Sequence, residues 1–168
     1  MQSVKQHEFE SKEQMPNPGQ SGEQPALQPW ILVTDDSKAV CSMLKKIAKD
    51  MGLIARELGN FLELPRILRE DPPVAVVLDL ERPGGLSGPA IGRFIRQYQG
   101  EHIPIVVFSG LSFAEREKVV HEIDADASVP KGDSLEHLHL TLKRVIRDTP
   151  STRMLLDPPG TSRDMRRK

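Results

Sequence analysis

The sequence has little of the chemistry that secreted, membrane-spanning or polyanion-binding proteins need. Cys41 is its single cysteine, which excludes an internal disulfide and fits a reducing compartment. Basic and acidic residues nearly balance, with a formal net charge of −1 and a pI of about 6.5, so bulk charge gives no case for binding nucleic acid or an anionic membrane. The N-terminus lacks the apolar core of a secretory signal, and no apolar run is long enough to cross a membrane. These absences predict a soluble cytoplasmic protein.

Both ends of the chain have the composition of tails. Residues 1–28 are rich in Gln, Glu, Ser and Pro and poor in large apolar groups, and residues 148–168 carry repeated prolines and end on three basic residues. Segments of this kind bury too little surface to offset the entropy lost on ordering, so we expect both to be disordered. One folded domain is predicted over residues 29–147, which is long enough for a real core.

Between the tails, short apolar runs alternate with stretches whose apolar residues recur at helical spacing. Candidate strands lie at 29–36, 53–59, 73–80, 103–110 and 127–132, and candidate helices at 37–52, 60–71, 87–100, 112–124 and 133–148. This alternation, with short connections, predicts an α/β fold with a five-stranded, doubly wound parallel sheet and helices on both faces. Residues 74–78 and 104–108 are apolar at consecutive positions, as in strands that are covered on both sides.

Several helix ends carry recognisable signals. Ser112 is predicted to cap the helix over 112–124, and Pro89 is predicted at the first position of the helix over 87–100. Asp133 and Glu136 have the spacing of a capping box at the start of the last helix. The apolar stripe of that helix is predicted to consist of Leu135, Leu138, Leu142 and Val145.

Polar side chains stand where the predicted strands end. Asp35 and Asp36 end the first strand, and Asp79, Ser109 and Lys131 end the third, fourth and fifth. The carboxyl ends of parallel strands lie along one edge of the sheet, where open sheets bind ligands, so we expect these groups to converge. Alone, Asp79 would more simply cap a helix or pair with Lys131; its coincidence with the other groups favours a chemical role.

Three converging carboxylates predict a cation site. A like-charged pair at roughly 4 Å costs about 4 kcal/mol at an effective dielectric near 20, so either the pKa values rise or a cation lies among the acids. Carboxylate and carbonyl oxygens suit Mg²⁺. A carboxylate beside Mg²⁺, with Lys131 and Ser109 directed at its oxygens, can act as a nucleophile and form an aspartyl phosphate.

In this order, the motifs resemble the receiver domain of two-component response regulators. The resemblance rests on "ILVTDD", "VVLDLERPGG", "PIVVFSG" and "VPK", followed by an amphipathic last helix, and it covers roughly Trp30 to Ile146. It implies a flavodoxin-like sheet in the strand order 2-1-3-4-5. It also implies a phosphoprotein that takes part in phosphorelay signal transduction.

The resemblance gives roles to the acidic residues. Asp79 is implied to be the phosphoacceptor, and Asp35 and Asp36 are implied to be the acidic pair that binds Mg²⁺. Asp79 and the backbone carbonyl of Glu81 are implied to complete the metal shell. Because Ser37 and Asp36 are both possible N-caps of the first helix, which acid holds the metal stays open at this point.

The resemblance also implies partners. Ser109 is implied to bond the phosphoryl group and Lys131 to be the family's invariant cation. The implied donor is a phosphohistidine on a sensor histidine kinase or a phosphotransfer protein. Only about twenty residues follow the last helix, so we expect a stand-alone, chemotaxis-type regulator that binds an unknown downstream protein. Such a domain is not an enzyme beyond slow autodephosphorylation, and no direct contact with nucleic acid or membrane is expected.

Three positions depart from the family pattern. Ser128 stands where an aromatic residue usually moves inward on activation, Gly132 where proline usually follows the lysine, and Gly110 where alanine usually follows the hydroxyl residue. These departures keep open an alternative, a receiver-like adaptor that binds partners independently of phosphorylation. A phosphatase of the haloacid-dehalogenase type ranks last, because "TDDSK" lacks the D-x-D spacing that such enzymes place after the first strand.

Overall fold

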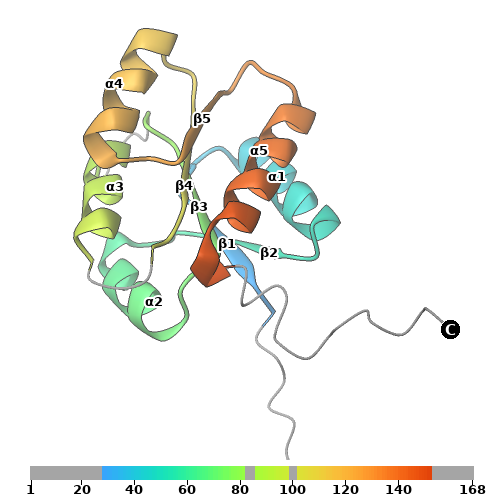
Figure 1. Ribbon diagram of the computed structural model, residues 1–168, viewed down its shortest axis with the longest axis vertical. Helices are drawn as coiled ribbons and strands as arrows, with labels where there is room; N and C mark the ends of the chain where they lie inside the picture. Colours follow the sequence, from blue (N-terminus) through green and yellow to red (C-terminus); the bar gives the residue numbers. More distant parts are fainter. Residues whose placement is uncertain (1–27, 82–85, 99–101, 153–168) are drawn as a thin grey trace, which may run out of the picture.

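Strands and helices alternate along the chain in the computed structural model, which describes residues 28–81, 86–98 and 102–152 (Figure 1). The strands are β1 (Trp30–Val33), β2 (Ile54–Glu57), β3 (Ala75–Leu78), β4 (Ile105–Ser109) and β5 (Ala127–Pro130). The helices are α1 (Lys38–Asp50), the 3₁₀ turn η1 (Phe61–Glu63), α2 (Leu64–Glu70), α3 (Gly88–Gln97), α4 (Phe113–Ile123) and α5 (Leu135–Asp148). The strands form a parallel sheet in the order β2-β1-β3-β4-β5, which confirms the predicted fold class and strand order.

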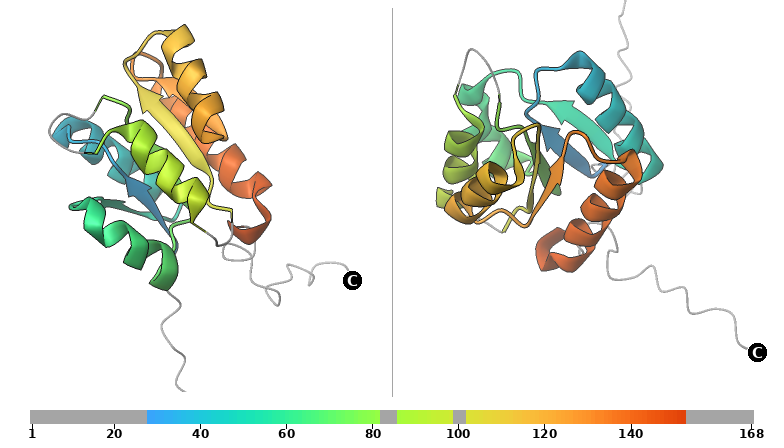
Figure 2. Two further views of the ribbon diagram at one scale, coloured as in Figure 1. Left: turned by 90° about the vertical axis from the view of Figure 1, so that its left-hand side faces the viewer. Right: turned by 90° about the horizontal axis from the view of Figure 1, so that it is seen from above.

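Helices cover both faces of the sheet (Figures 1 and 2). On one face α1 and α5 pack against the strands, and on the other α2, α3 and α4 do so. Because successive strand residues point to opposite faces, Ile31 and Val33 join the first cluster while Trp30 and Leu32 join the second. This two-sided burial is why the strands are apolar at consecutive positions.

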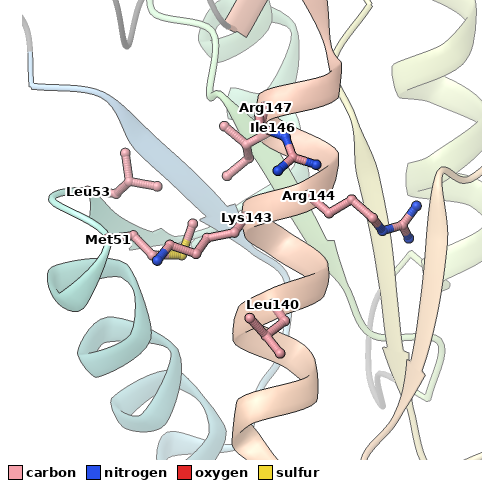
Figure 3. A pocket seen from close by; sticks show the side chains of 7 residues that line it. All are labelled: Met51, Leu53, Leu140, Lys143, Arg144, Ile146 and Arg147. Carbon is pink, nitrogen blue, oxygen red and sulfur yellow. The ribbon is translucent and has the colours of Figure 1, made fainter.

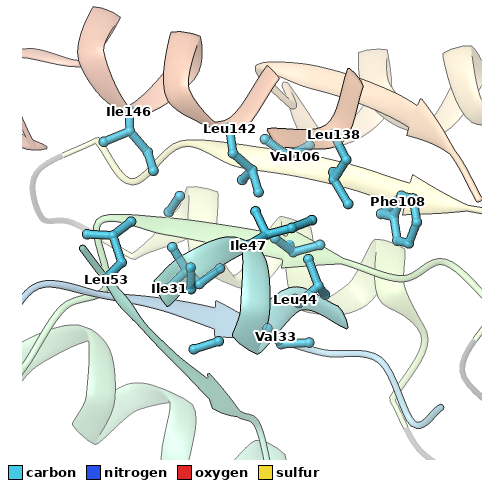
Figure 4. Packing of buried hydrophobic residues seen from close by; sticks show 14 of the residues in the cluster. Ile31, Val33, Leu44, Ile47, Leu53, Val106, Phe108, Leu138, Leu142 and Ile146 are labelled. Carbon is cyan, nitrogen blue, oxygen red and sulfur yellow. The ribbon is translucent and has the colours of Figure 1, made fainter. Parts of the chain in front are cut away.

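The cluster beneath α1 and α5 is shown in Figure 4. Leu44 of α1 and Leu138 and Leu142 of α5 are fully buried and point toward the sheet, where they pack with Val106 of β4. Each such side chain contributes about 1.5–3 kcal/mol when removed from water. This packing fixes the two helices, and therefore the loops that precede them, at the carboxyl edge of the sheet.

Helix starts agree in part with the predictions. Ser112 caps α4 in a capping box with Glu115, as the sequence predicts for the cap. The predicted capping box of the last helix is wrong: Ser134, not Asp133, is the N-cap of α5, because its side chain accepts from the His137 N–H at 3.1 Å. Asp133 bonds the His137 ring instead, which holds the pKa of the Asp133 carboxyl below its usual value.

Two further details of the helices differ from the predictions. Pro89 is the second residue of α3, because Gly88 begins the helix. Leu135 is 53% exposed and does not belong to the buried stripe of α5, whose buried members include Leu138, Leu142 and Val145. A leucine in the first turn of a helix has the right spacing for the stripe, but here its side chain is left exposed.

The described chain continues past residue 148. The hydroxyl of Thr149 donates to the Val145 carbonyl at 2.8 Å, and that of Thr152 donates to the Ile146 carbonyl at 2.6 Å, and both threonines are buried. The predicted domain boundaries stay predictions, since residues 1–27 and 153–168, and with them most of both predicted tails, lie outside the described residues. Within the described ranges, no helix has both the length and the apolar composition required to traverse a bilayer.

Candidate functional site

Asp79 follows β3 directly and is 2% exposed. Its backbone N–H donates to Thr34 Oγ1 at 3.3 Å, and its Oδ1 accepts from the Glu81 N–H at 3.2 Å. A Cβ on Gly88 would lie 2.1 Å from the Asp79 carbonyl oxygen, so only glycine lets α3 begin this close to the strand end. The carboxylate is therefore held in one place by the strand, the next loop and the start of a helix.

Thr34 is a site residue that the sequence analysis missed. It follows β1 and is buried, and its hydroxyl links the end of β1 to the backbone of Asp79 on the neighbouring strand. The signal in the sequence was a polar residue directly after the apolar run "WILV", at a position that a covered strand would otherwise fill with another apolar side chain.

Asp35 and Asp36 lie beside Asp79 at the end of β1. Asp35 is buried and its Oδ1 accepts from the Ser37 N–H at 2.9 Å, whereas Asp36 is exposed. Ser37 is the N-cap of α1, since its side chain accepts from the Val40 N–H. The structure thus resolves the choice of N-cap in favour of Ser37 and leaves both acids facing the site.

Cys41 packs beneath this pair. Its thiol donates to the Asp35 carbonyl at 3.3 Å, and burial raises the pKa of the thiol. A thiol that stays protonated is a poor nucleophile, so Cys41 contributes packing rather than chemistry.

Lys131 follows β5 and reaches both buried acids. Its Nζ lies 2.9 Å from Asp35 Oδ2 and 3.0 Å from Asp79 Oδ2. Burial alone lowers the pKa of Lys131, but the hydrogen bonds and charges of the two aspartates outweigh it, so the pKa is raised above its usual value. The ammonium is therefore charged at neutral pH, and it links the end of β5 to the ends of β1 and β3 across the intervening strand β4.

The same acids fit a divalent cation. Asp35, Asp36 and Asp79 each offer a carboxylate oxygen, and these oxygens all lie within 4.8 Å of one another. Asp35 Oδ2 is buried, and among the described residues it accepts no well-directed hydrogen bond, although Lys131 Nζ lies 2.9 Å away. Three carboxylates thus face one ammonium, and an oxygen-only ligand set of this kind suits Mg²⁺.

Ser109 and Glu81 complete the group that the strand ends bring together. Ser109 is fully buried at the end of β4, and its Oγ lies 3.4 Å from Glu81 Oε2. The carboxylate of Glu81 also accepts from the Gly110 N–H at 2.9 Å. From the sequence, Glu81 was predicted to act through its backbone carbonyl alone. The side-chain contact could not be predicted, because Glu81 and Ser109 lie far apart in the chain.

The two positions that depart from the family pattern near β5 have distinct surroundings. Ser128 is half-buried, and its hydroxyl donates to Glu117 Oε1 of α4 at 3.2 Å. Gly132 lies in open space, since a Cβ there would meet nothing within 4 Å among the described residues. The first departure replaces an aromatic ring by a hydrogen bond, and the second leaves the loop after Lys131 without a side chain.

A separate hollow of about 450 Å³ lies between the end of α1 and the C-terminal half of α5 (Figure 3). Its side chains are apolar or basic: Met51, Leu53, Leu140, Ile146, Lys143, Arg144 and Arg147. Leu53 immediately precedes β2, so this hollow adjoins the amino edge of the sheet, away from Asp79. It shares no lining residue with the acidic site.

Comparison with known proteins gives one consistent family. The sequence model of the response regulator receiver domain matches residues 31–143, which include all the predicted site residues. The chain is 29% identical over 124 residues to the chemotaxis protein CheV2 of Helicobacter pylori, an alignment that covers 71% of this chain and 39% of the relative. It is 29% identical over 119 residues to the response regulator MprA of Mycobacterium ulcerans, covering 71% of this chain and 50% of the relative. The chain therefore spans half or less of the length of these relatives.

Solved structures show the same fold. One neighbour is the receiver domain of the sensor histidine kinase PA1611 from Pseudomonas aeruginosa PAO1, which has a magnesium ion coordinated in its active site cleft. The two share 18% sequence identity with a TM-score of 0.60, and the match covers 71% of this chain and 98% of the neighbour. At this level of identity, the similarity shows only that the two proteins share the same arrangement of strands and helices.

Proposed function

The chain belongs to the response regulator receiver domain family, and on that premise we propose that Asp79 accepts a phosphoryl group. Receiver domains are phosphoacceptors rather than enzymes in the ordinary sense, and they bind Mg²⁺ at their acidic site. Asp35, Asp36, Asp79 and the backbone carbonyl of Glu81 are the groups that would hold the ion here. The observation that carries the proposal is the contact of Lys131 Nζ with both Asp35 and Asp79.

In the proposed step, a carboxylate oxygen of Asp79 attacks the phosphorus of the donor. A new O–P bond forms, the P–N bond of a phosphohistidine or the P–O bond of acetyl phosphate breaks, and the leaving group departs with the bonding electrons. Bound Mg²⁺ supplies neutralisation of the charge on the transferred group. Lys131 contributes a second positive charge next to the attacking oxygen.

Ser109 offers the transferred group a donor from the neighbouring strand. Its hydroxyl lies at the end of β4, next to β3 in the sheet, and the adjacent Gly110 N–H points into the same space. Because the Gly110 N–H is fixed on the backbone and the Ser109 hydroxyl is on a fully buried residue, both donors are held near the place of the transferred group, which favours phosphoryl transfer.

We further propose that a sensor histidine kinase or a phosphotransfer protein is the donor in the cell, and that the phosphorylated domain signals by binding a downstream protein. A cytoplasmic location is part of this proposal and is supported by the single cysteine, Cys41. The conformational readout needs a coupling of about 1–3 kcal/mol between Asp79 and the binding surface.

Labelling with acetyl phosphate tests the phosphoacceptor. With Mg²⁺ present, intact-mass spectrometry should detect one added phosphoryl group on the wild type and on Asp50→Asn, an exposed aspartate of α1 that serves as the matched control. Asp79→Asn should take up none. Label on Asp79→Asn, or label that does not depend on Mg²⁺, would contradict the proposal.

A second candidate is an adaptor that binds its partner without regulation by phosphate. The hydrogen bond from Ser128 to Glu117 favours it, because the position that usually carries a moving aromatic ring is tied to α4 by a small polar side chain. Labelled protein that binds its partner with the same affinity as unlabelled protein would support the adaptor. A wild type that takes up no label would leave only this candidate.

A further inference from the structure

The carboxylate of Glu81 already binds the donors that a phosphoryl group on Asp79 would use. Glu81 Oε2 accepts from the Gly110 N–H at 2.9 Å and lies 3.4 Å from the Ser109 hydroxyl. The backbone N–H of Glu81 is bonded to Asp79 Oδ1, so its side chain starts next to the phosphoacceptor. The carboxylate of Glu81 thus binds the same hydroxyl and N–H groups that are proposed to bind the phosphoryl group.

Gly110 is what makes room for this carboxylate. A Cβ at Gly110 would lie 2.8 Å from Glu81 Oε2 and 3.8 Å from Glu81 Cδ, and apart from chain neighbours it would meet no other described atom within 4 Å. Real Cβ atoms essentially never approach a neighbour that closely. The missing side chain at Gly110 and the position of the Glu81 carboxylate therefore depend on each other.

We propose that Glu81 is an internal competitor of the phosphoryl group: its carboxylate occupies Ser109 and Gly110 in the unphosphorylated protein and has to leave before the group can bind there. This inference rests on the proposed function of Asp79 and adds a residue that sets the rate of phosphorylation. Two anions cannot share the same donors at short distance, because like charges repel and each donor satisfies one acceptor.

The competitor can leave without disturbing the fold. Glu81 is exposed and belongs to neither of the two core clusters. When an exposed side chain rotates out into the solvent, the free-energy cost is that of the hydrogen bonds it loses, and hydrogen bonds to water compensate for part of it. Glu81 therefore delays the transferred group without excluding it.

Four variants test the inference by the rate of Asp79 labelling with acetyl phosphate and Mg²⁺. Glu81→Ala keeps the backbone carbonyl and removes the competitor, and Gly110→Ala expels it while keeping its charge. Each should label about three- to tenfold faster than wild type, the range expected for giving up one or two hydrogen bonds at an exposed site. In the double variant the second change should add little, because both act on one contact. Gly59→Ala, where a new Cβ meets nothing within 4 Å, is the matched control.

A second readout does not involve phosphate. The Gly110 amide proton should exchange with solvent faster in Glu81→Ala than in wild type, as measured by NMR, since its acceptor is gone. Unchanged exchange would overturn the contact itself.

The labelling outcomes separate this inference from the proposed function. Wild type that labels, together with Glu81→Ala that labels no faster, would overturn the competitor and leave the phosphoacceptor standing. Wild type that labels, together with Glu81→Ala and Gly110→Ala that label about three- to tenfold faster, would support both. Absence of label from all variants would overturn both.

Discussion

Two neighbouring regions of the molecule keep the receiver pattern to different degrees. At the carboxyl edge of the sheet, Lys131 Nζ bridges two buried aspartates at 2.9 and 3.0 Å. At the surface formed by α4 and β5, the aromatic residue typical of the family is replaced by Ser128, which donates to Glu117. The charged groups of the proposed phosphorylation chemistry are therefore all present, whereas the position that carries the family's aromatic residue makes a different interaction here.

The largest expected effect concerns metal binding at the acidic edge. Mg²⁺ at a hundred times its Kd should add about 2.7 kcal/mol to the free energy of unfolding of the wild type. Asp36→Asn removes one proposed ligand and should require more Mg²⁺ for the same gain, whereas Asp50→Asn should behave as wild type. Urea unfolding with and without Mg²⁺ measures the difference. An unfolding midpoint that does not change with Mg²⁺ would show that the acidic edge is not a metal site, and the contrast with the α4–β5 surface would then no longer hold.

Removing the ammonium tests whether Lys131 holds the acids together. Lys131→Ala leaves Asp35 and Asp79 uncompensated and should cost about 2 kcal/mol, less than for a fully buried pair because the lysine side chain is about a quarter exposed. Urea unfolding of Lys131→Ala and of Lys143→Ala, an exposed lysine of α5, gives the measurement and its control. Equal losses in the two variants would show that the bridge adds nothing.

The raised pKa of Lys131 predicts a smaller effect at alkaline pH. A lysine whose pKa is higher in the folded than in the unfolded state stabilises the fold fully below its ordinary value of about 10.4, and that contribution is lost as pH rises through the folded-state pKa. The free energy of unfolding of wild type minus that of Lys131→Ala should therefore stay flat to about pH 10 and then fall. A difference that grows with pH would have the wrong sign.

The smallest effect is expected at the rebuilt surface. Ser128→Ala removes one hydrogen bond to Glu117 and should lower the free energy of unfolding by about 0.5–1.5 kcal/mol. Glu117→Gln keeps an acceptor and should cost less. Neither variant should change the rate of Asp79 labelling if the two regions are separate. A change in labelling rate would show instead that the α4–β5 surface and the acidic edge are energetically coupled.

Most of the fold could be predicted because its signals are local. Consecutive apolar residues in β3 and β4 reflect coverage on both faces, and helical spacing identified each long helix. The wrong capping box arose because two neighbouring residues carry the same signal. Asp133 and Ser134 are both good caps, and spacing alone does not tell which one receives the first N–H.

The candidate site was predictable in its members but less so in their contacts. Parallel strand ends bring Asp35, Asp79 and Lys131 together whatever the details of the loops. The bond between Glu81 and Gly110 depends on the course of two loops and on the absence of a Cβ, which no periodicity reports. Contacts that join residues distant in the chain through flexible side chains lie beyond pattern analysis of one sequence.

The bridge formed by Lys131 also sets an order of events during synthesis. Asp35 and Asp79 leave the ribosome ahead of Lys131, and about fifty residues separate Asp79 from it, which takes roughly 3–10 s to translate. During that interval the nascent chain holds both acids without this ammonium, and cations in solution can serve as counter-charges. Lys131 arrives with β5, the edge strand of the sheet, so we expect the acidic edge to acquire its full set of charges only after that strand has been translated.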